Sequence, residues 1–271
     1  MLVALTSDIR LENSTLAVEI RPQTGRVRHI GFVGGPNLLW EPAAPPDVGG
    51  WTNFGGDKLW FSPQSAWGWP PDPDLDGRPW VARREGSSFH LVSPISRRFG
   101  IRLERRISLS GDTVVFRNRL INLGPRPVSY APWQVTQIVD PDWVRMDAAR
   151  GLHRYDDRPL LAGYNVLEGD RLWIRRNRAE SRKFGTGSPA GKIEARIGDT
   201  LVGMIAAFEA GAEYPDEGSA QQVFTGEDPS DYVELEVTGP LAEVKPGRSV
   251  ELTVKIRLSR PANFPRSPFE R

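Results

Sequence analysis

Cysteine is absent from the sequence, which excludes disulfide bonds and thiol catalysis. Histidine is scarce, with 3 residues, and lysine accounts for only 5 of the 35 Lys and Arg residues. No stretch approaches the ~18 consecutive apolar residues of a membrane-spanning helix. The N-terminus also lacks the basic region of a signal peptide. We therefore expect a cytoplasmic protein with no membrane partner.

An excess of charge of one sign is lacking too, because 35 basic residues stand against 34 acidic ones, for a net charge of +1. The whole chain therefore gives no electrostatic basis for binding nucleic acid. The sequence also lacks a glycine-rich nucleotide loop followed by a helix, the histidine spacings of zinc sites and the G-x-S-x-G motif of serine hydrolases. We expect neither a cofactor nor a metal.

What the sequence does contain is alternation of apolar and polar residues. In 249–259 the apolar residues occupy every second position: Val250, Leu252, Val254, Ile256 and Leu258. Segments 99–110, 107–124 and 199–209 follow the same two-residue period, which is typical of strands. No capped run of a dozen residues has the period of a helix. The pattern predicts an all-β protein, a many-stranded antiparallel fold in one domain over residues 1–271.

Two segments, 41–80 and 150–192, look long and irregular, and long loops in compact domains are often functional. Within the first lies WTNFGGDKLWFSPQSAWGWPPDPD (51–74), with four tryptophans and a Pro-Pro pair. We expect neither a helix nor a central strand there. Indole faces stack on sugar rings, and nearby polar groups bind hydroxyls, so this segment could wall a carbohydrate cleft. Alternatively, the indoles close one end of a β-sandwich.

Several motifs together resemble the galactose-mutarotase-like superfamily. Within it, the sequence is most similar to an uncharacterised bacterial family with the signature GGDKLW…PQ…WGWPPD, found here at 55–60, 63–64 and 67–72. Segment 24–40 is similar to the first hairpin of mutarotases, and 232–258 to their final strand unit. The resemblance implies a large antiparallel β-supersandwich with a carbohydrate site on a concave sheet face.

A mutarotase needs a base for the proton of the C1 hydroxyl and an acid for the ring oxygen. The resemblance implies that Glu236 is the base. Strand alternation independently puts Tyr232, Glu234 and Glu236 on one face, and two neighbouring carboxylates would raise the pKa of at least one of them. The alternative is a solvent-facing strand that merely carries glutamates.

The acid is harder to place. The superfamily has a histidine on a central strand, but the comparable segment 128–140 has none, and Trp133 and Gln134 stand near that place. An indole or an amide can bind a sugar oxygen but cannot supply a proton at a useful pKa. Asp57 or Lys58 could replace the missing acid, and His153 could reach a pocket.

The predicted catalytic residues are thus Glu236, Asp57 and Lys58. The predicted substrate-binding residues are Trp60, Gln64, Trp67, Trp69, Trp133, Gln134, Tyr232 and Glu234. We expect a carbohydrate-binding protein of the mutarotase-like class, with an aldose 1-epimerase-type isomerase as its enzymatic form and a small or oligomeric carbohydrate as partner. A non-catalytic carbohydrate-binding module and a polysaccharide lyase- or hydrolase-related domain remain alternatives.

Two further patterns have competing interpretations. DPDLDG (72–77) begins like a calcium-binding loop, but position twelve is Arg83, which favours a simple turn. Segment 171–183 holds six basic residues, which could clamp an anionic sugar or form a solvated hairpin.

Overall fold

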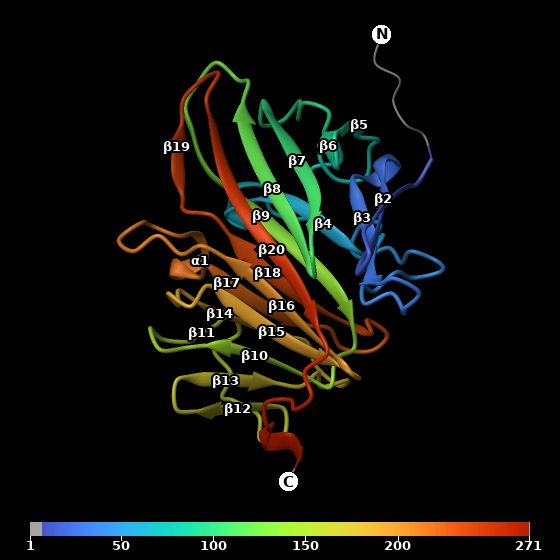
Figure 1. Cartoon of the computed structure of the whole chain (residues 1–271). Helices are drawn as coiled ribbons and strands as arrows, with labels where there is room; N and C mark the ends of the chain where they lie inside the picture. Colours follow the sequence, from blue (N-terminus) through green and yellow to red (C-terminus); the bar gives the residue numbers. More distant parts are fainter. Residues whose placement is uncertain (1–6, 271) are drawn as a thin grey trace.

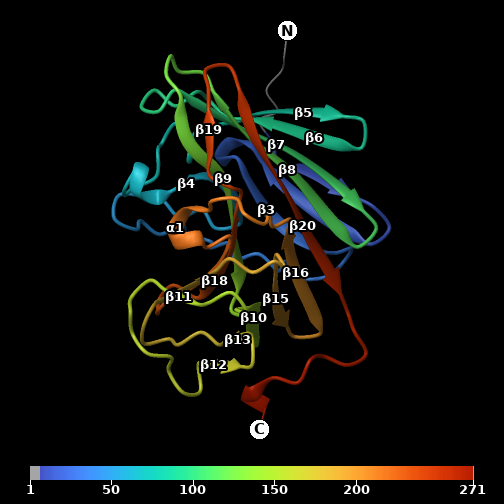
Figure 2. The same ribbon diagram turned by 90° about the vertical axis from the view of Figure 1, so that its left-hand side faces the viewer.

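The computed structural model describes residues 7–270, which form two antiparallel sheets of ten strands each. Figures 1 and 2 show the sheets from two directions, with the long strands β7, β8 and β20 on one side of the molecule. Helical structure in this part of the chain is confined to α1 (Pro215–Gly218) and the 3-10 turns η1 (Pro22–Thr24), η2 (Gln64–Ala66) and η3 (Pro268–Glu270). The predicted all-β sandwich is confirmed.

The first sheet contains the strand that carries Glu236. Its strands follow, in spatial order, as β1 (Ile9–Glu12), β2 (Leu16–Arg21), β3 (Arg26–Phe32), β4 (Asp57–Ser62), β9 (Val128–Val139), β18 (Tyr232–Thr238), β17 (Gln221–Thr225), β14 (Arg182–Thr186) and β11 (His153–Arg154), with β19 (Ala242–Val244) paired to β9.

The second sheet contains the most regular hairpins. Its order is β12 (Asn165–Glu168), β13 (Arg171–Ile174), β10 (Trp143–Asp147), β15 (Lys192–Ile197), β16 (Thr200–Ala206), β20 (Ser249–Ser259), β8 (Thr113–Asn122), β7 (Ile101–Ser110), β6 (Ser88–Val92) and β5 (Val81–Glu85). In β20, Leu252, Val254, Ile256 and Leu258 are buried while the residues between them are exposed, as the alternation predicts.

The hydrophobic core includes residues of both sheets. Leu59, Val233 and Leu235 of the first sheet belong to the same buried cluster as Leu103 and Phe116 of the second. The opposite faces of β4, β9 and β18 point away from the second sheet.

The expectation of irregular chain in 41–80 and 150–192 is wrong in part. Residues Asp57–Ser62 form β4, a fully buried strand between β3 and β9, and the second segment contains β11 to β14. Adjacent Asp57 and Lys58 looked incompatible with a central strand. Each of these charges nevertheless has an oppositely charged partner. Asp57 pairs with Arg105 on one face of the sheet, and Lys58 pairs with Glu234 on the other.

Candidate functional site

The face of the first sheet opposite to the one that contacts β7 and β8 carries a row of aligned residues. The strand register sets them side by side, each opposite the next: His153, Gly185, Gln222, Glu236, Val135 and Lys58. Because residues two apart share a face, Trp133, Gln137, Lys183 and Glu234 lie on it as well. We call this surface the site face.

Glu236 lies near the middle of the site face, and its side chain is 0% exposed. Its Oε2 accepts hydrogen bonds from Trp133 Nε1 at 3.0 Å and from Lys183 Nζ at 3.0 Å. Its Oε1 is buried and has no hydrogen-bond partner in the described part of the chain. One carboxylate oxygen is therefore fixed by two donors, while the other is left to accept a proton or a ligand hydroxyl.

The environment of Glu236 alters its acidity. Burial raises the pKa of Glu236 to about 7, against the opposing effect of the Lys183 ammonium, and the nearby charge of Glu234 raises it further. The expected elevated carboxyl pKa thus occurs, with burial rather than the second carboxylate as its main cause. A carboxyl group that titrates near pH 7 can both take and return a proton at that pH.

Lys183 reaches Glu236 from β14, two strands away from β18. Its Nζ lies 4.9 Å from the centre of the Trp133 ring and 5.2 Å from that of Tyr155, within cation–π range of both. Its side chain is 20% exposed, so the ammonium lies between buried Glu236 and the solvent-accessible side of the site. The sequence analysis counted Lys183 only within the basic run. Alternation along 182–186 would have placed it on a strand face, had the segment been taken as a strand.

Glu234 and Lys58 form a second ion pair on the site face. Glu234 Oε1 accepts from Lys58 Nζ at 3.1 Å and from Gln137 Nε2 at 2.9 Å. Lys58 Nζ also lies 4.8 Å from the centre of the Trp60 ring, and burial lowers the pKa of its ammonium. Lys58 therefore lies on the site face, where its hydrogen-bond contact is with Glu234.

Asp57 and Gln134 lie on the opposite face, inside the core. Asp57 forms an ion pair with buried Arg105, and its Oδ2 accepts from Gln134 Nε2 at 2.7 Å and Thr136 Oγ1 at 2.6 Å. Strand alternation explains the separation, because each stands next in sequence to a site-face residue. The structure does not bring these two predicted site residues together with Glu236.

Three of the predicted tryptophans, Trp60, Trp67 and Trp133, form a buried tryptophan wall beside Glu236. Trp60 packs edge-on against Trp67 and Trp133, with ring centres 5.7 and 5.4 Å apart. Trp67 Nε1 donates to the carbonyl oxygen of Phe61 at 2.9 Å. Trp69 is 45% exposed, and Gln64 is half-buried in η2. Most of these rings are thus packed against one another.

Tyr232, the remaining predicted binding residue, is buried at the start of β18. Its ring lies 4.6 Å from that of Trp40. Beside it a groove of about 910 Å³ is lined in part by Trp40, Val139 and Asp231. Open space therefore adjoins the site face at the Tyr232 end of β18, away from Glu236.

A short loop around α1 contributes two acidic residues that the sequence analysis missed. Asp216 and Glu217 have left-handed backbones, with φ of 53° and 57°. Asp216 Oδ2 accepts from Ser62 Oγ at 3.3 Å and Gln222 Nε2 at 3.2 Å, and Figure 2 shows α1 in front of the first sheet. Gln222 is the cross-strand neighbour of Glu236, so the loop places Asp216 next to the site. No sequence motif marks these residues.

His153 stands at the end of the row. Three strand spacings separate it from Glu236, roughly 14 Å between backbones. Its Nδ1 lies 3.0 Å from Glu217 Oε2, and its ring contacts Tyr155. His153 therefore borders the site without contacting Glu236.

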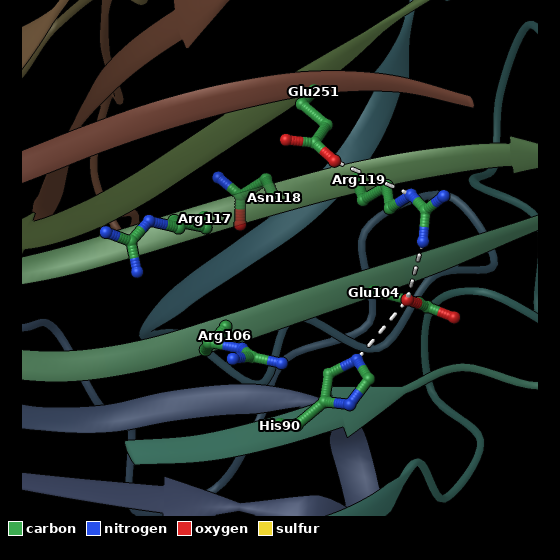
Figure 3. Close-up of a pocket in the computed structure, with 7 residues that line it drawn as sticks. All are labelled: His90, Glu104, Arg106, Arg117, Asn118, Arg119 and Glu251. Atoms are coloured by element: carbon green, nitrogen blue, oxygen red, sulfur yellow. Dashed lines mark hydrogen bonds and ion pairs between the residues drawn. The ribbon is translucent and has the colours of Figure 1, made fainter. Parts of the chain in front are cut away.

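His29 lies in β3, and His90 lies on the second sheet, in a shallow pocket of about 250 Å³. Figure 3 shows His90 beside Glu104, which also faces Arg119, while Arg119 lies near Glu251. These charges neutralise one another, as on a solvated sheet face.

Three of the six basic residues in 171–183, Arg176, Arg178 and Arg182, form ion pairs away from the site. Arg176 is paired with Asp140 at 3.0 Å and Asp228 at 2.9 Å. Arg182 is paired with Asp156 at 2.8 Å. Of this run, Lys183 is the residue that contacts Glu236, which gives little support to an arginine clamp for an anionic sugar.

The DPDLDG segment is a turn whose carboxylates bind protein donors. Asp72 accepts from Ser96, Asp74 from Arg97 at 2.9 Å, and Asp76 from the indoles of Trp51 and Trp60. Within residues 7–270 no group of three or more His, Cys, Asp or Glu side chains is arranged to hold a metal ion. None of the helices described is long and apolar enough to span a membrane.

Comparison with known proteins identifies the fold. No protein-family model and no curated protein matches the sequence, so the resemblance to the uncharacterised bacterial family is not confirmed. A galactose mutarotase-like protein from Lactobacillus casei has a similar structure, with a TM-score of 0.68 and 12% identity over 93% of this chain and 100% of that one.

Two other solved structures agree. A galactose mutarotase-like protein from Clostridium acetobutylicum gives a TM-score of 0.62 at 10% identity, covering 94% of this chain and 95% of that one. A candidate aldose 1-epimerase from Escherichia coli K12 gives 0.62 at 14% identity, covering 94% and 99%. The chain has the galactose mutarotase-like fold.

Proposed function

We propose that this galactose mutarotase-like protein binds a carbohydrate on the site face and interconverts the anomers of an aldose, with Glu236 as the base. The observation that carries the proposal is the state of the Glu236 carboxyl group. It is fully buried, one oxygen is held by two donors, and the other oxygen has no partner among residues 7–270.

The chemistry fits this arrangement. Ring opening begins when a base removes the proton of the C1 hydroxyl, and the best base titrates near the working pH. With a pKa of about 7, Glu236 is partly ionised there and also returns the proton readily when the ring closes. Its unpartnered Oε1 is the atom for this transfer, because Oε2 is already occupied.

Groups around Glu236 suit a ligand rich in hydroxyls. The side-chain oxygens Gln222 Oε1 and Gln137 Oε1 are buried on the same face and have no hydrogen-bond partner in the part of the chain that the structure describes. Sugar hydroxyls would donate to such acceptors, and half-buried Asp216 offers another. The neighbouring groove beside Trp40 has room for further sugar units of an oligomeric carbohydrate.

The direct test is anomer interconversion, measured by NMR saturation transfer with neutral, acidic and phosphorylated aldoses. We expect the wild-type protein to accelerate exchange for at least one of them, and Glu236→Gln to abolish the acceleration while it still binds that sugar. No acceleration of any aldose would refute the enzymatic proposal.

One observation favours a second function, a non-catalytic carbohydrate-binding module. Glu236 is 0% exposed, so in this conformation its carboxylate is closed to a ligand. Line broadening or shifts of a sugar's resonances without faster exchange would identify this module. It would leave the site face as a binding surface without turnover.

A further inference from the structure

We infer that Lys183 is the general acid of this site, donating a proton to the sugar's ring oxygen while Glu236 acts on the C1 hydroxyl. The inference rests on the isomerase proposed above. Its starting point is the set of donors on Glu236, which in the described residues consists of Trp133 Nε1 and Lys183 Nζ. An indole N–H does not transfer its proton at useful pH, whereas an ammonium does.

The position of Lys183 suits this role. Its Nζ is held between the rings of Trp133 and Tyr155, at 4.9 and 5.2 Å from their centres. Unlike Glu236, its side chain is partly exposed, and Tyr155 beside it is also accessible. A sugar entering from this side meets the ammonium first and the buried carboxylate beneath it. Acid and base are neighbours there, which suits two proton transfers at oxygens that are both bonded to C1.

Other candidates for the acid are less suitable. Lys58 is fully buried and bonded to Glu234. His153 is roughly 14 Å from Glu236 along the row and bonded to Glu217. Burial raises the pKa of the Tyr155 hydroxyl, which makes it a weaker proton donor.

The proton transfers balance without any further reactant. Glu236 Oε1 takes the proton of the C1 hydroxyl, the C1–ring oxygen bond breaks, and the ring oxygen receives a proton from the Lys183 ammonium. The products are the open-chain aldehyde, a neutral carboxylic acid and a neutral amine. Rotation about C1–C2 followed by the reverse transfers gives the other anomer and restores the ion pair. Burial favours the neutral intermediate pair, because it contains no charge to desolvate.

The experiment compares Lys183→Arg with Lys183→Met. Arginine keeps the positive charge, the reach and the hydrogen bond to Glu236, but its pKa is too high for proton donation. We expect both variants to lower kcat at least about 100-fold on the aldose that the wild type converts, with sugar binding retained. Lys192→Arg is the matched control, since Lys192 is a partly exposed lysine paired with Glu194 on the second sheet. It should leave kcat unchanged.

Each outcome separates the inference from the function on which it rests. If Lys183→Arg retains kcat within about threefold of wild type, charge rather than proton donation matters, and the inference is overturned while the isomerase stands. If Lys183→Met does not fold, the arginine variant still decides. Restoration of activity to Lys183→Ala by added small amines would support proton donation directly. If the wild type accelerates no aldose, the proposed function fails and the inference fails with it.

Discussion

The two faces of the first sheet each bury a carboxylate completely, and they use it differently. On the core face, Asp57 binds Arg105 through one oxygen and accepts from Gln134 and Thr136 through the other. On the site face, Glu236 has one oxygen bound by two donors and one that no described residue contacts through a hydrogen bond. Both carboxylates are 0% exposed, so burial alone does not distinguish a functional group from a structural one. The unpartnered oxygen does, because an unsatisfied buried polar atom is costly unless a ligand or proton occupies it.

The largest expected effect is on the site face. Glu236→Gln keeps the shape of the side chain but cannot accept a proton, so we expect turnover to fall by about 10²–10⁴-fold. Sugar binding, measured by titration calorimetry, should change little. Asp57→Asn is the comparison variant, and any activity lost there should follow the loss of folded protein.

A substantial fall in turnover for folded Asp57→Asn, equal to that of Glu236→Gln, would contradict the division between the faces. Such a result would return Asp57 to the catalytic residues proposed from the sequence.

The second effect concerns stability, and here we expect the larger loss from a variant of the core face, Asp57→Asn, and the smaller one from a variant of the site face. Asp57→Asn leaves Arg105 as a buried charge without its counter-ion, which typically costs about 3–5 kcal/mol of unfolding free energy. Urea denaturation should show this loss. Lys58→Met, which removes a buried cation from the site face, leaves half-buried Glu234 with Gln137 as a donor and should cost less. Equal losses would mean that both faces act as core.

Alternation made part of this arrangement predictable. The apolar residues at every second position from Leu252 to Leu258 predicted the last strand. The alternation in 232–238 placed Tyr232, Glu234 and Glu236 on one face. The same rule, applied to 57–62, would have separated Asp57 from Lys58. Two adjacent charges after a Gly-Gly pair are typical of a loop, and their partners Arg105 and Glu234, distant in the sequence, are what allow a buried strand here.

The rest of the site arises from contacts between distant segments. Lys183 is brought to Glu236 by the pairing of β14 with β17, and Asp216 by a turn with two left-handed residues. Such pairings depend on the register of the whole sheet, which no local pattern contains. The absence of a histidine from 128–140 is visible in the sequence, but the contact between Glu236 and a lysine two strands away is not.

The third prediction follows from the raised pKa of Glu236. The base must be ionised, so kcat/KM should rise with pH through about 7. Stability should respond in the opposite direction. A carboxyl whose pKa is raised on folding stabilises the folded state fully below its ordinary pKa of 4.5, and this contribution is lost as pH rises through about 7.

In the wild type, the free energy of unfolding should fall by on the order of 3 kcal/mol between pH 4.5 and pH 8 through this group, and Glu236→Gln should remove that pH dependence. Thermal or urea melts across that range would measure it. An unchanged pH dependence of stability in the variant would mean that Glu236 does not titrate near 7.

The smallest expected effect tests the donors on Glu236. Trp133→Phe keeps an aromatic ring but removes the N–H that donates to Oε2, so the ionised carboxylate loses a stabilising hydrogen bond. The pKa of Glu236 should rise further, and the midpoint of the activity profile should move upward by about 1 pH unit. Trp67→Phe is the matched control, because the Trp67 N–H donates to the Phe61 carbonyl and not to a titrating group. That variant should lose some stability and keep its pH midpoint. If both variants shift the midpoint equally, the tryptophan wall acts on Glu236 through packing alone, and the hydrogen bond from Trp133 does not set its acidity.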